Sequence, residues 1–150
     1  MLKIMKNIYD LDVNRLMALS DDIDAQDLHE QYSYLLSFFS DQKGIYAIWE
    51  EDGRYCSALR IEEYHDGKLI TALQTAPQLR NLGYATKLLH AVIDYLKSNH
   101  VDTLYSHIHK RNDASVAVHV ACGFHSILEH GVLLDGTVSW SYRTYCYKVN

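Results

Sequence analysis

Residues 69–97 constrain the fold of this chain more than any other segment. A strand-like run from Leu69 to Thr75 stops near the single proline, Pro77, and an amphipathic helix follows from Gly83 to Lys97. A strand, a tight turn and a helix in direct succession predict a layered fold in which the helix packs on a sheet. One face of the predicted helix carries Ala85, Leu88, Leu89, Val92, Ile93 and Leu96.

The turn between this strand and this helix has the residues of an anion-binding loop. Gly83 lacks a side chain, so a bulky anion can contact the backbone there and unusual dihedral angles cost little. Arg80 adds a permanent charge whose planar fork suits phosphate oxygens. The first N–H groups of a helix have no partner inside it, and the helix dipole is positive there. The turn therefore predicts a phosphate site, and an ordinary loop before a helix is the alternative.

A second segment, Asn112 to Phe124, follows a predicted strand at Thr103 to Ile108 and has the pattern of a short helix. Asn112 or Asp113 can cap its N-terminus. Gly123 stands where a left-handed residue is expected after the helix. The segment therefore predicts a second strand-to-helix unit beside the first.

Together, these two segments resemble the GNAT superfamily of N-acetyltransferases, from about Ile61 to the C-terminus. The family motif [QR]-x-x-G-x-[GA] is matched by Arg80, Gly83 and Ala85. The family motif N-x-x-[AS]-x-x-x-Y-x-x-x-G-F is matched by Asn112, Ser115, Gly123 and Phe124. His119 occupies the position of the family tyrosine.

The resemblance implies an α+β fold with α/β/α layers in one domain, residues 1–150. The expected sheet is mixed and mostly antiparallel, with a parallel, splayed central strand pair and helices on both faces. The hydrophobic patterns fit this order of elements. They predict strands at residues 2–8, 44–50, 55–64, 68–75, 103–108, 126–134 and 138–149, and helices at 11–19, 23–39, 83–97 and from 112 onward.

The resemblance also implies acetyl-CoA as the co-substrate. In the family, the pantetheine arm enters the gap between the splayed strands and pairs with strand backbone. On this mapping Gln74 and Thr75 contact the acyl or pantetheine portion, and Asn112 reaches the cofactor from the next helix. The pyrophosphate is expected on Arg80, Asn81, Leu82, Gly83, Tyr84, Ala85 and Thr86.

The reaction that the resemblance implies is transfer of an acetyl group to an amine by direct attack on the thioester. The amine must lose a proton, the oxyanion needs donors, and the leaving thiolate benefits from an acid. His119 is the candidate acid, with a packed structural histidine as the alternative. Gln74 stands where family members often carry a basic Glu; it cannot take a proton, but it can orient a water or the acceptor.

The general base is left open among five residues, each with a solvated or structural role as the alternative. They are Glu62, Glu63, His65, His107 and His109. Glu62 and Glu63 face opposite sides of their strand, whereas His107 and His109 share a face and are expected near the splay. The two histidines also resemble a pair of metal ligands, but the sequence places no third ligand, so no metal is expected.

The acceptor pocket is expected from the first two helices, the loop between them and the C-terminal hairpin. Its candidate aromatic residues are Tyr32, Trp49, Tyr64, Trp140 and Tyr142, for which core packing is the alternative. An acidic cluster before the second helix attracts a cation or caps the helix. It consists of Asp21, Asp22 and Asp24.

Composition fits a cytoplasmic enzyme of one domain. The chain has 150 residues, 48% of them hydrophobic, which is enough for a proper core. Its three cysteines have no metal-binding spacing, so reduced thiols are the simplest interpretation. The N-terminus does not resemble a signal peptide, and no apolar run approaches the ~20 residues of a membrane span. The net charge of −5 argues against general nucleic-acid binding.

The expected partners are therefore acetyl-CoA and an amine of a small molecule or protein, with neither nucleic acid nor membrane; the family also makes a homodimer plausible. Two further hypotheses stay open. Because Gln74 and His119 depart from the family pattern, the domain can instead bind acyl-CoA with little or no transferase activity. The third hypothesis is a protein-interaction domain whose turn at Arg80 to Ala85 binds no cofactor.

Overall fold

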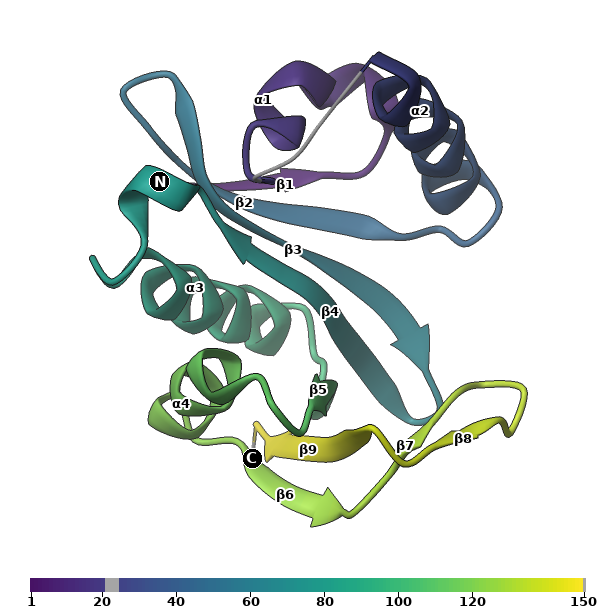
Figure 1. The fold of residues 1–150 in the computed structure, drawn as a ribbon. Helices are drawn as coiled ribbons and strands as arrows, with labels where there is room; N and C mark the ends of the chain where they lie inside the picture. Colours follow the sequence, from purple (N-terminus) through teal and green to yellow (C-terminus); the bar gives the residue numbers. More distant parts are fainter. Residues whose placement is uncertain (21–24, 150) are drawn as a thin grey trace.

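The computed structural model describes residues 1–20 and 25–149 of the chain (Figure 1). The strands are β1 (Leu2–Met5), β2 (Ile45–Glu51), β3 (Arg54–Tyr64), β4 (Gly67–Thr75), β5 (Thr103–His109), β6 (His125–Leu128), β7 (Gly131–Val132), β8 (Val138–Ser139) and β9 (Tyr142–Lys148). Seven of them form one sheet in the order β1-β2-β3-β4-β5-β9-β6, and β7 pairs with β8 in a small separate sheet. Within the large sheet β4 and β5 are parallel, and the other neighbours are antiparallel.

Helices cover both faces of the sheet (Figure 1). They are α1 (Val13–Met17), α2 (Ala25–Ser40), α3 (Tyr84–Ser98) and α4 (Asp113–Ala121), with short 3₁₀ helices η1 (Ile8–Asp10) and η2 (Pro77–Leu79). Strand alternation explains the two layers. In β2, Ile48 packs on the side of Leu35 and Phe38 of α2, whereas the preceding Ala47 packs on the side of Leu89 of α3. The predicted layered α+β fold is therefore confirmed.

The central parallel pair diverges along its length. β4 and β5 are paired from Lys68 opposite Leu104 to Ile70 opposite Ser106, and no pairing between them follows, although β4 continues to Thr75. Ala72 lies just beyond this point with a φ of 54°, and the register of β4 with β3 shifts there. A non-glycine residue with positive φ is uncommon and typical of a bulge. The bulge turns β4 away from β5, which confirms the predicted splay.

The N-terminal elements are shorter than the sequence predicts. The strand expected at residues 2–8 ends at Met5, because the Asn7 side chain accepts hydrogen bonds from the N–H groups of Tyr9 and Asp10 and begins η1. The helix expected at 11–19 covers Val13–Met17. The predicted start at residue 23 and the acidic cluster Asp21, Asp22 and Asp24 lie outside the described residues.

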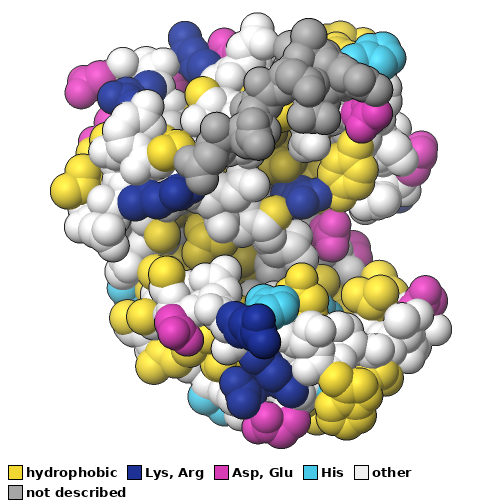
Figure 2. Space-filling model, in the orientation of Figure 1, with side chains coloured by type: hydrophobic (Ala, Val, Ile, Leu, Met, Phe, Trp, Pro, Cys, Tyr) yellow, Lys and Arg dark blue, Asp and Glu magenta, His cyan; other side chains and the backbone are white. Residues whose placement is uncertain are grey.

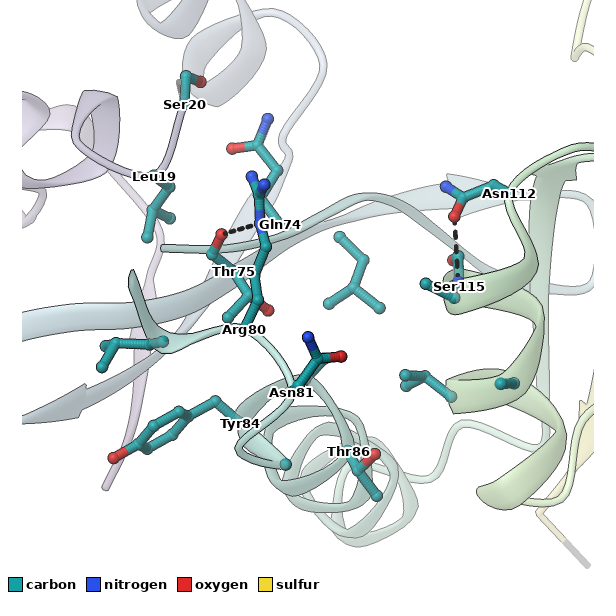
Figure 3. Close-up of a pocket in the computed structure, with 17 residues that line it drawn as sticks. Leu19, Ser20, Gln74, Thr75, Arg80, Asn81, Tyr84, Thr86, Asn112 and Ser115 are labelled. Carbon is teal, nitrogen blue, oxygen red and sulfur yellow. Dashed lines mark hydrogen bonds between the residues drawn. The ribbon is translucent and has the colours of Figure 1, made fainter. Parts of the chain in front are cut away.

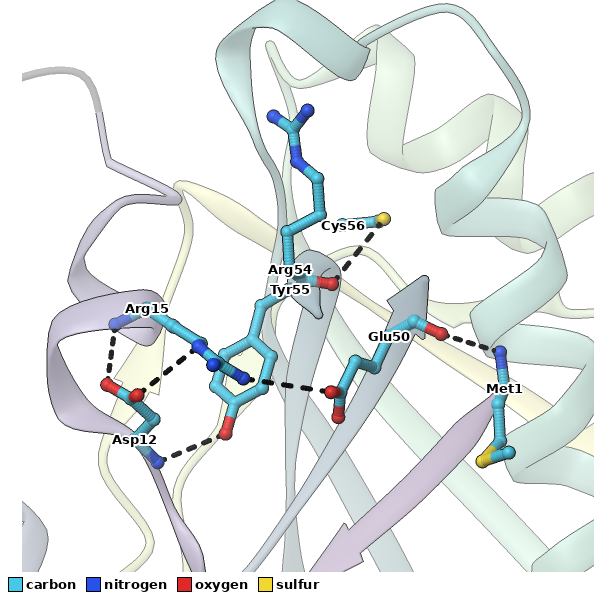
Figure 4. Close-up of polar contacts among 7 residues, drawn as sticks. All are labelled: Met1, Asp12, Arg15, Glu50, Arg54, Tyr55 and Cys56. Carbon is cyan, nitrogen blue, oxygen red and sulfur yellow. Dashed lines mark hydrogen bonds and ion pairs between the residues drawn. The ribbon is translucent and has the colours of Figure 1, made fainter. Parts of the chain in front are cut away.

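Polar contacts fix α1 against the sheet (Figure 4). Asp12 caps the helix by accepting a hydrogen bond from the Arg15 N–H at 3.1 Å. The Asp12 N–H in turn donates to the Tyr55 hydroxyl of β3 at 3.0 Å, and the Arg15 side chain forms an ion pair with Glu50 of β2 at 3.7 Å. These contacts hold the segment that follows α1 beside the end of β4.

The C-terminal region differs most from the prediction. In place of two long strands at 126–134 and 138–149, the chain forms β6, the small β7–β8 hairpin and β9. The register of β6 with β9 is irregular between Ser126 and Leu128, and the chain then leaves the large sheet. The predicted turn at Asp135 and Gly136 is confirmed, with Gly136 at a φ of 88° and the Asp135 carboxylate accepting from the Thr137 N–H.

No helix in the described ranges is both long and apolar enough to span a bilayer. The cysteines Cys56, Cys122 and Cys146 are buried and form no disulfide.

Candidate active site

A cavity of about 970 Å³ opens beside the far end of β4 (Figure 3). Its walls are the end of β4, the loop into α3, the first turns of α4 and the segment after α1. The fold thus brings together most of the residues that the sequence assigns to the cofactor. Those that line the cavity are Gln74, Thr75, Arg80, Asn81, Gly83, Tyr84, Ala85, Thr86 and Asn112.

The loop before α3 exposes a row of backbone N–H groups. Gly83 is the N-cap of the helix with a φ of 86°, and Asn81 also has a positive φ of 64°. The first helical hydrogen bond runs from the Lys87 N–H to the Gly83 carbonyl at 3.0 Å. Within the described residues, the N–H groups of 81–86 donate to no protein acceptor. A Cβ at Gly83 would meet no atom within 4 Å, so the loop is open where an anion would approach.

Arg80 and the end of β4 form the rim of the cavity. The Arg80 Nε–H points toward the Thr75 carbonyl at 3.4 Å, so the guanidinium lies along the strand end (Figure 3). The buried Ser57 hydroxyl donates to the Gln74 carbonyl at 2.7 Å and holds β4 on β3. The Gln74 side chain remains exposed, and its amide has no acidic or basic role near neutral pH.

Two residues of the predicted loop are placed differently from the rest. Leu82 is 61% exposed and does not line the cavity, so its contribution is limited to its backbone N–H. The Tyr84 hydroxyl donates to Glu51 of β2 at 2.9 Å, and this hydrogen bond raises the pKa of the phenol. Its hydroxyl therefore stabilises the loop against the sheet and is already engaged.

A second cavity, of about 200 Å³, fills the splay between β4 and β5. Leu73, Asn112 and Ser115 line both cavities, so the two spaces are adjacent. The other lining residues are Ile70, Thr71, Ala72, Ser106, His107, Ile108, His109, His119 and Tyr142. Seen from outside, the molecule is hollowed between the part that carries α1 and α2 and the part that carries α4 and the β7–β8 hairpin (Figure 2).

Asn112 and His119 reach the smaller cavity from α4. The Asn112 Oδ1 accepts from the Ser115 N–H at 3.1 Å, which confirms the predicted helix cap. His119 is 1% exposed, and its Nδ1–H donates to the Ser115 carbonyl at 2.7 Å. Because a carbonyl oxygen can only accept, Nδ1 carries the ring proton. Nε2 is buried and has no partner in the described part of the chain.

The charge of His119 follows from this setting. Burial lowers the pKa of the imidazole, and the hydrogen bond to Ser115 opposes that shift in part. The ring is therefore neutral at pH 7, with its free lone pair on Nε2. Phe124 packs edge-on against it at 5.1 Å between ring centres.

The other candidates for acid–base chemistry are separated by the fold. Glu63 is exposed and pairs with Lys68, whereas Glu62 on the opposite face of β3 is half-buried. His65 lies exposed in the β3–β4 turn. His107 and His109 both line the smaller cavity, as their shared strand face predicts. In residues 1–20 and 25–149, no three His, Cys, Asp or Glu side chains are arranged to hold a metal ion.

The aromatic candidates for the acceptor pocket also divide. Tyr142 lines the smaller cavity, and Tyr64 contacts His107 of that cavity. Trp49 lines neither cavity and follows the alternative of core packing: its ring packs on the α3 side of the sheet, and its Nε1–H donates to Glu51 at 3.0 Å. Tyr32 and Trp140 are exposed and line neither cavity.

Some lining residues were not predicted. Leu19 and Ser20 reach the larger cavity from the segment after α1, and Ala114, Ala117 and Val118 reach it from α4. The exposed face of the helix pattern could have indicated the α4 residues. No local signal marks Leu19 or Ser20, because the contacts of α1 with β2 and β3 decide where they lie.

The model of the acetyltransferase (GNAT) family matches residues 7–124. The chain belongs to this family. No curated protein sequence gives a significant match. Among solved structures, this GNAT protein is similar to the ribosomal-protein-S18-alanine N-acetyltransferase from Escherichia coli, with 15% identity, a TM-score of 0.70, and coverage of 100% of this chain and 95% of that one.

Two further structures have the same fold. An N-acetyltransferase from Staphylococcus aureus Mu50 has 16% identity and a TM-score of 0.70, covering 100% of this chain and 99% of its own. The Campylobacter jejuni N-acetyltransferase PseH, solved in complex with acetyl coenzyme A, has 16% identity and a TM-score of 0.74, with 99% of each chain covered. At these identities the likeness shows the GNAT fold, which confirms the predicted family and architecture.

Proposed function

We propose that this protein is an acetyl-CoA-dependent N-acetyltransferase that moves an acetyl group to an amine of a small molecule or protein. One observation carries the proposal: loop N–H groups without an acceptor among the described residues, the Arg80 guanidinium and the stretch of β4 that does not pair with β5 border two adjacent cavities. That combination suits a long ligand with a diphosphate at one end and an extended amide-containing arm at the other.

In this proposal the diphosphate binds the N–H groups of residues 81–86 and the charge of Arg80. The arm runs along β4 beyond Ile70, where the strand has lost its pairing with β5 and its backbone groups are available. The thioester then reaches the smaller cavity. Thr75 and Asn112 border this path, and Gln74 at the strand end orients the acceptor or a water.

The chemistry proceeds by direct attack. The amine lone pair forms the C–N bond, the carbonyl electrons move onto oxygen, and the C–S bond breaks when the carbonyl re-forms. His119 is the proposed acid for the departing sulfur. Since its Nδ1–H is engaged by Ser115, the proton is delivered from Nε2. Since burial lowers the pKa of His119, its protonated form gives the proton up readily but must be reloaded in each cycle.

The alternative is a GNAT domain that binds acyl-CoA with little or no transfer. Its supporting observations are the Gln74 amide at the position of a basic residue and a neutral His119. Titration with acetyl-CoA followed by thiol release across a panel of amines distinguishes the possibilities. The proposal expects saturable binding and amine-dependent release. Binding without release would favour the acyl-CoA module, and absence of binding at high micromolar ligand would reject both.

A further inference from the structure

His107 is the first residue of β5 beyond its last pairing with β4. Ser106 pairs with Ile70, and after it the strands separate. The neighbours Ser106 and Ile108 are buried on the α3 side of the sheet, so His107 faces the opposite side. Its half-buried ring lines the cavity in the splay. The fold thus places an imidazole in the cavity to which the proposed function assigns the thioester.

Hydrogen bonds from β3 and β7 define the tautomer of this imidazole. The Tyr64 hydroxyl donates its single proton to the carbonyl of Val132, which can only accept. The same Tyr64 oxygen lies 3.3 Å from His107 Nε2. With its proton already used, Tyr64 must accept from an Nε2–H. His107 therefore carries its proton on Nε2 and its lone pair on Nδ1.

The lone pair on Nδ1 is available to a ligand. Within the described residues Nδ1 has no hydrogen-bond partner, and it does not belong to the buried atoms that lack one, so it is accessible from the cavity that the ring lines. The ring is held on two sides: Tyr64 meets it edge-on at 5.4 Å between centres, and a methyl group placed on Gly131 would lie 3.6 Å from its Cγ. A clamped ring with one accessible lone pair is preorganised to accept a proton.

We propose that His107 Nδ1 is the general base of this enzyme and that Tyr64 is the positioning residue that sets its tautomer. The proposal rests on the proposed acetyl transfer. As the amine lone pair bonds to the thioester carbon, the N–H proton moves to Nδ1, and the carbonyl electron pair moves to oxygen. When the carbonyl re-forms, the C–S electron pair leaves with sulfur. Solvent then takes the proton from His107, and the departing sulfur takes its proton from protonated His119, the proposed acid.

Burial, assisted by a neighbouring histidine, keeps this base neutral. Burial lowers the pKa of His107, and the nearby His65 lowers it further. The other titratable groups around it are Tyr105 and His109 on β5 itself, together with Tyr64 of β3, Tyr142 of β9 and His119 of α4. The described residues show no carboxylate hydrogen-bonded or ion-paired with the ring. His107 is therefore unprotonated at pH 7 and takes its proton from the free amine.

His109 supplies a matched comparison. It lies two residues further along the same face of β5 and lines the same cavity. Its Nδ1, however, already accepts the Arg111 N–H at 3.1 Å. A histidine whose Nδ1 is occupied in this way cannot take the amine proton at that atom. Replacing each histidine in turn therefore separates base catalysis from mere loss of an imidazole in the cavity.

The first experiment compares H107Q with H109Q in steady-state thiol release. H107Q is expected to lower kcat by about 10²- to 10⁴-fold, as for loss of a general base, with acetyl-CoA affinity within a factor of about two. The decrease in kcat caused by H109Q is expected to be at least tenfold smaller than the decrease caused by H107Q. The pH dependence is measured with an aromatic amine that stays unprotonated throughout. The wild-type rate falls on the acid side as His107 is protonated, and H107Q lacks this limb.

A second measurement does not require activity. Imidazole ¹⁵N shifts of the labelled wild type, assigned with H107Q, are expected to show a protonated Nε2 and an unprotonated Nδ1 at His107. Y64F is expected to yield a mixture of tautomers and an intermediate loss of kcat. The opposite tautomer, an unchanged rate in H107Q, or equal losses in H107Q and H109Q would overturn the proposal. Wild-type protein that binds acetyl-CoA without any thiol release would instead remove the proposed function itself.

Discussion

The two sides of the splay are built in different ways. On the side of α3 and α4, two helix starts line the larger cavity. One is the backbone loop before α3, whose shape depends on Gly83, and the other is the start of α4, which Asn112 caps. On the side of α2 and the β7–β8 hairpin, the site consists of the Tyr64 side chain of β3, the His107 side chain of β5 and the Val132 carbonyl of β7. The first side leaves a motif in the sequence because a few adjacent residues define it. The second leaves none, because its members are far apart in the chain.

The largest expected effect tests the cofactor side through its charge. Arg80→Glu is expected to weaken acetyl-CoA binding about 100-fold, since it removes a charge-assisted contact and places a carboxylate beside phosphate. Isothermal titration gives the affinity. Arg54→Glu makes the same charge change at the exposed first residue of β3 and serves as the control. Equal affinities in the two variants would contradict the role of Arg80.

A smaller effect tests the backbone of the same loop. Gly83 and Gly53 both have positive φ, 86° and 73°, and a Cβ on either would meet nothing within 4 Å. Gly83→Ala and Gly53→Ala should therefore lose similar stability, about 1 kcal/mol each. Gly83→Ala alone is expected to weaken acetyl-CoA binding about tenfold, because its methyl group occupies the anion's approach. Similar binding by both variants would show that the amides of this loop do not hold the diphosphate.

The histidines on the two sides predict how stability depends on pH. Burial lowers the pKa of both His119 and His107, so the unfolded chain binds these protons more readily than the folded one. Their contribution to the free energy of unfolding is complete above about pH 6.5, the usual pKa of histidine. It is lost as the pH falls below that value, by up to about 1.4 kcal/mol per pH unit for each group. Denaturant unfolding is measured between pH 7.5 and pH 5. As the pH falls, the free energy of unfolding is expected to decrease less in His119→Leu than in the wild type.

The control for this measurement is His90→Leu, which replaces an exposed histidine of α3. It measures how far the slope of unfolding free energy against pH changes when an exposed imidazole is lost, and the change in His119→Leu is expected to exceed it. A slope in His119→Leu equal to that of the wild type would mean that His119 is as easily protonated in the folded chain as in the unfolded one.

The smallest effect concerns the hairpin that borders the hollow on the acceptor side. Trp140 is 67% exposed and contacts the His130 ring at 4.8 Å between centres. Trp140→Ser is expected to change the unfolding free energy by less than about 0.5 kcal/mol. If the hairpin contacts the acceptor, KM for the amine rises about threefold while the affinity for acetyl-CoA is unchanged. An unaltered KM would exclude Trp140 from the acceptor pocket.

Local signals predicted the elements that depend on neighbouring residues. The start of α3 at Gly83, the cap at Asn112 and the turn at Asp135 and Gly136 all follow from dihedral preference or side-chain capping. The prediction of two long C-terminal strands was wrong, because the alternation of apolar and polar residues does not reveal where β6 stops pairing with β9. For Trp49 the sequence left a pocket role and core packing open, and the structure favours the core, because the face on which its ring lies depends on the register of β2 with β3.

By itself, the sequence determined the family, the layered fold and the loop that faces the larger cavity, because each rests on residues adjacent in the chain or on periodic burial. Only the tertiary structure decided which side chains confront one another across the splay. A tautomer at His107 depends on one proton of Tyr64 and one carbonyl of Val132, and nothing short of folding brings these three residues from β5, β3 and β7 within hydrogen-bonding distance.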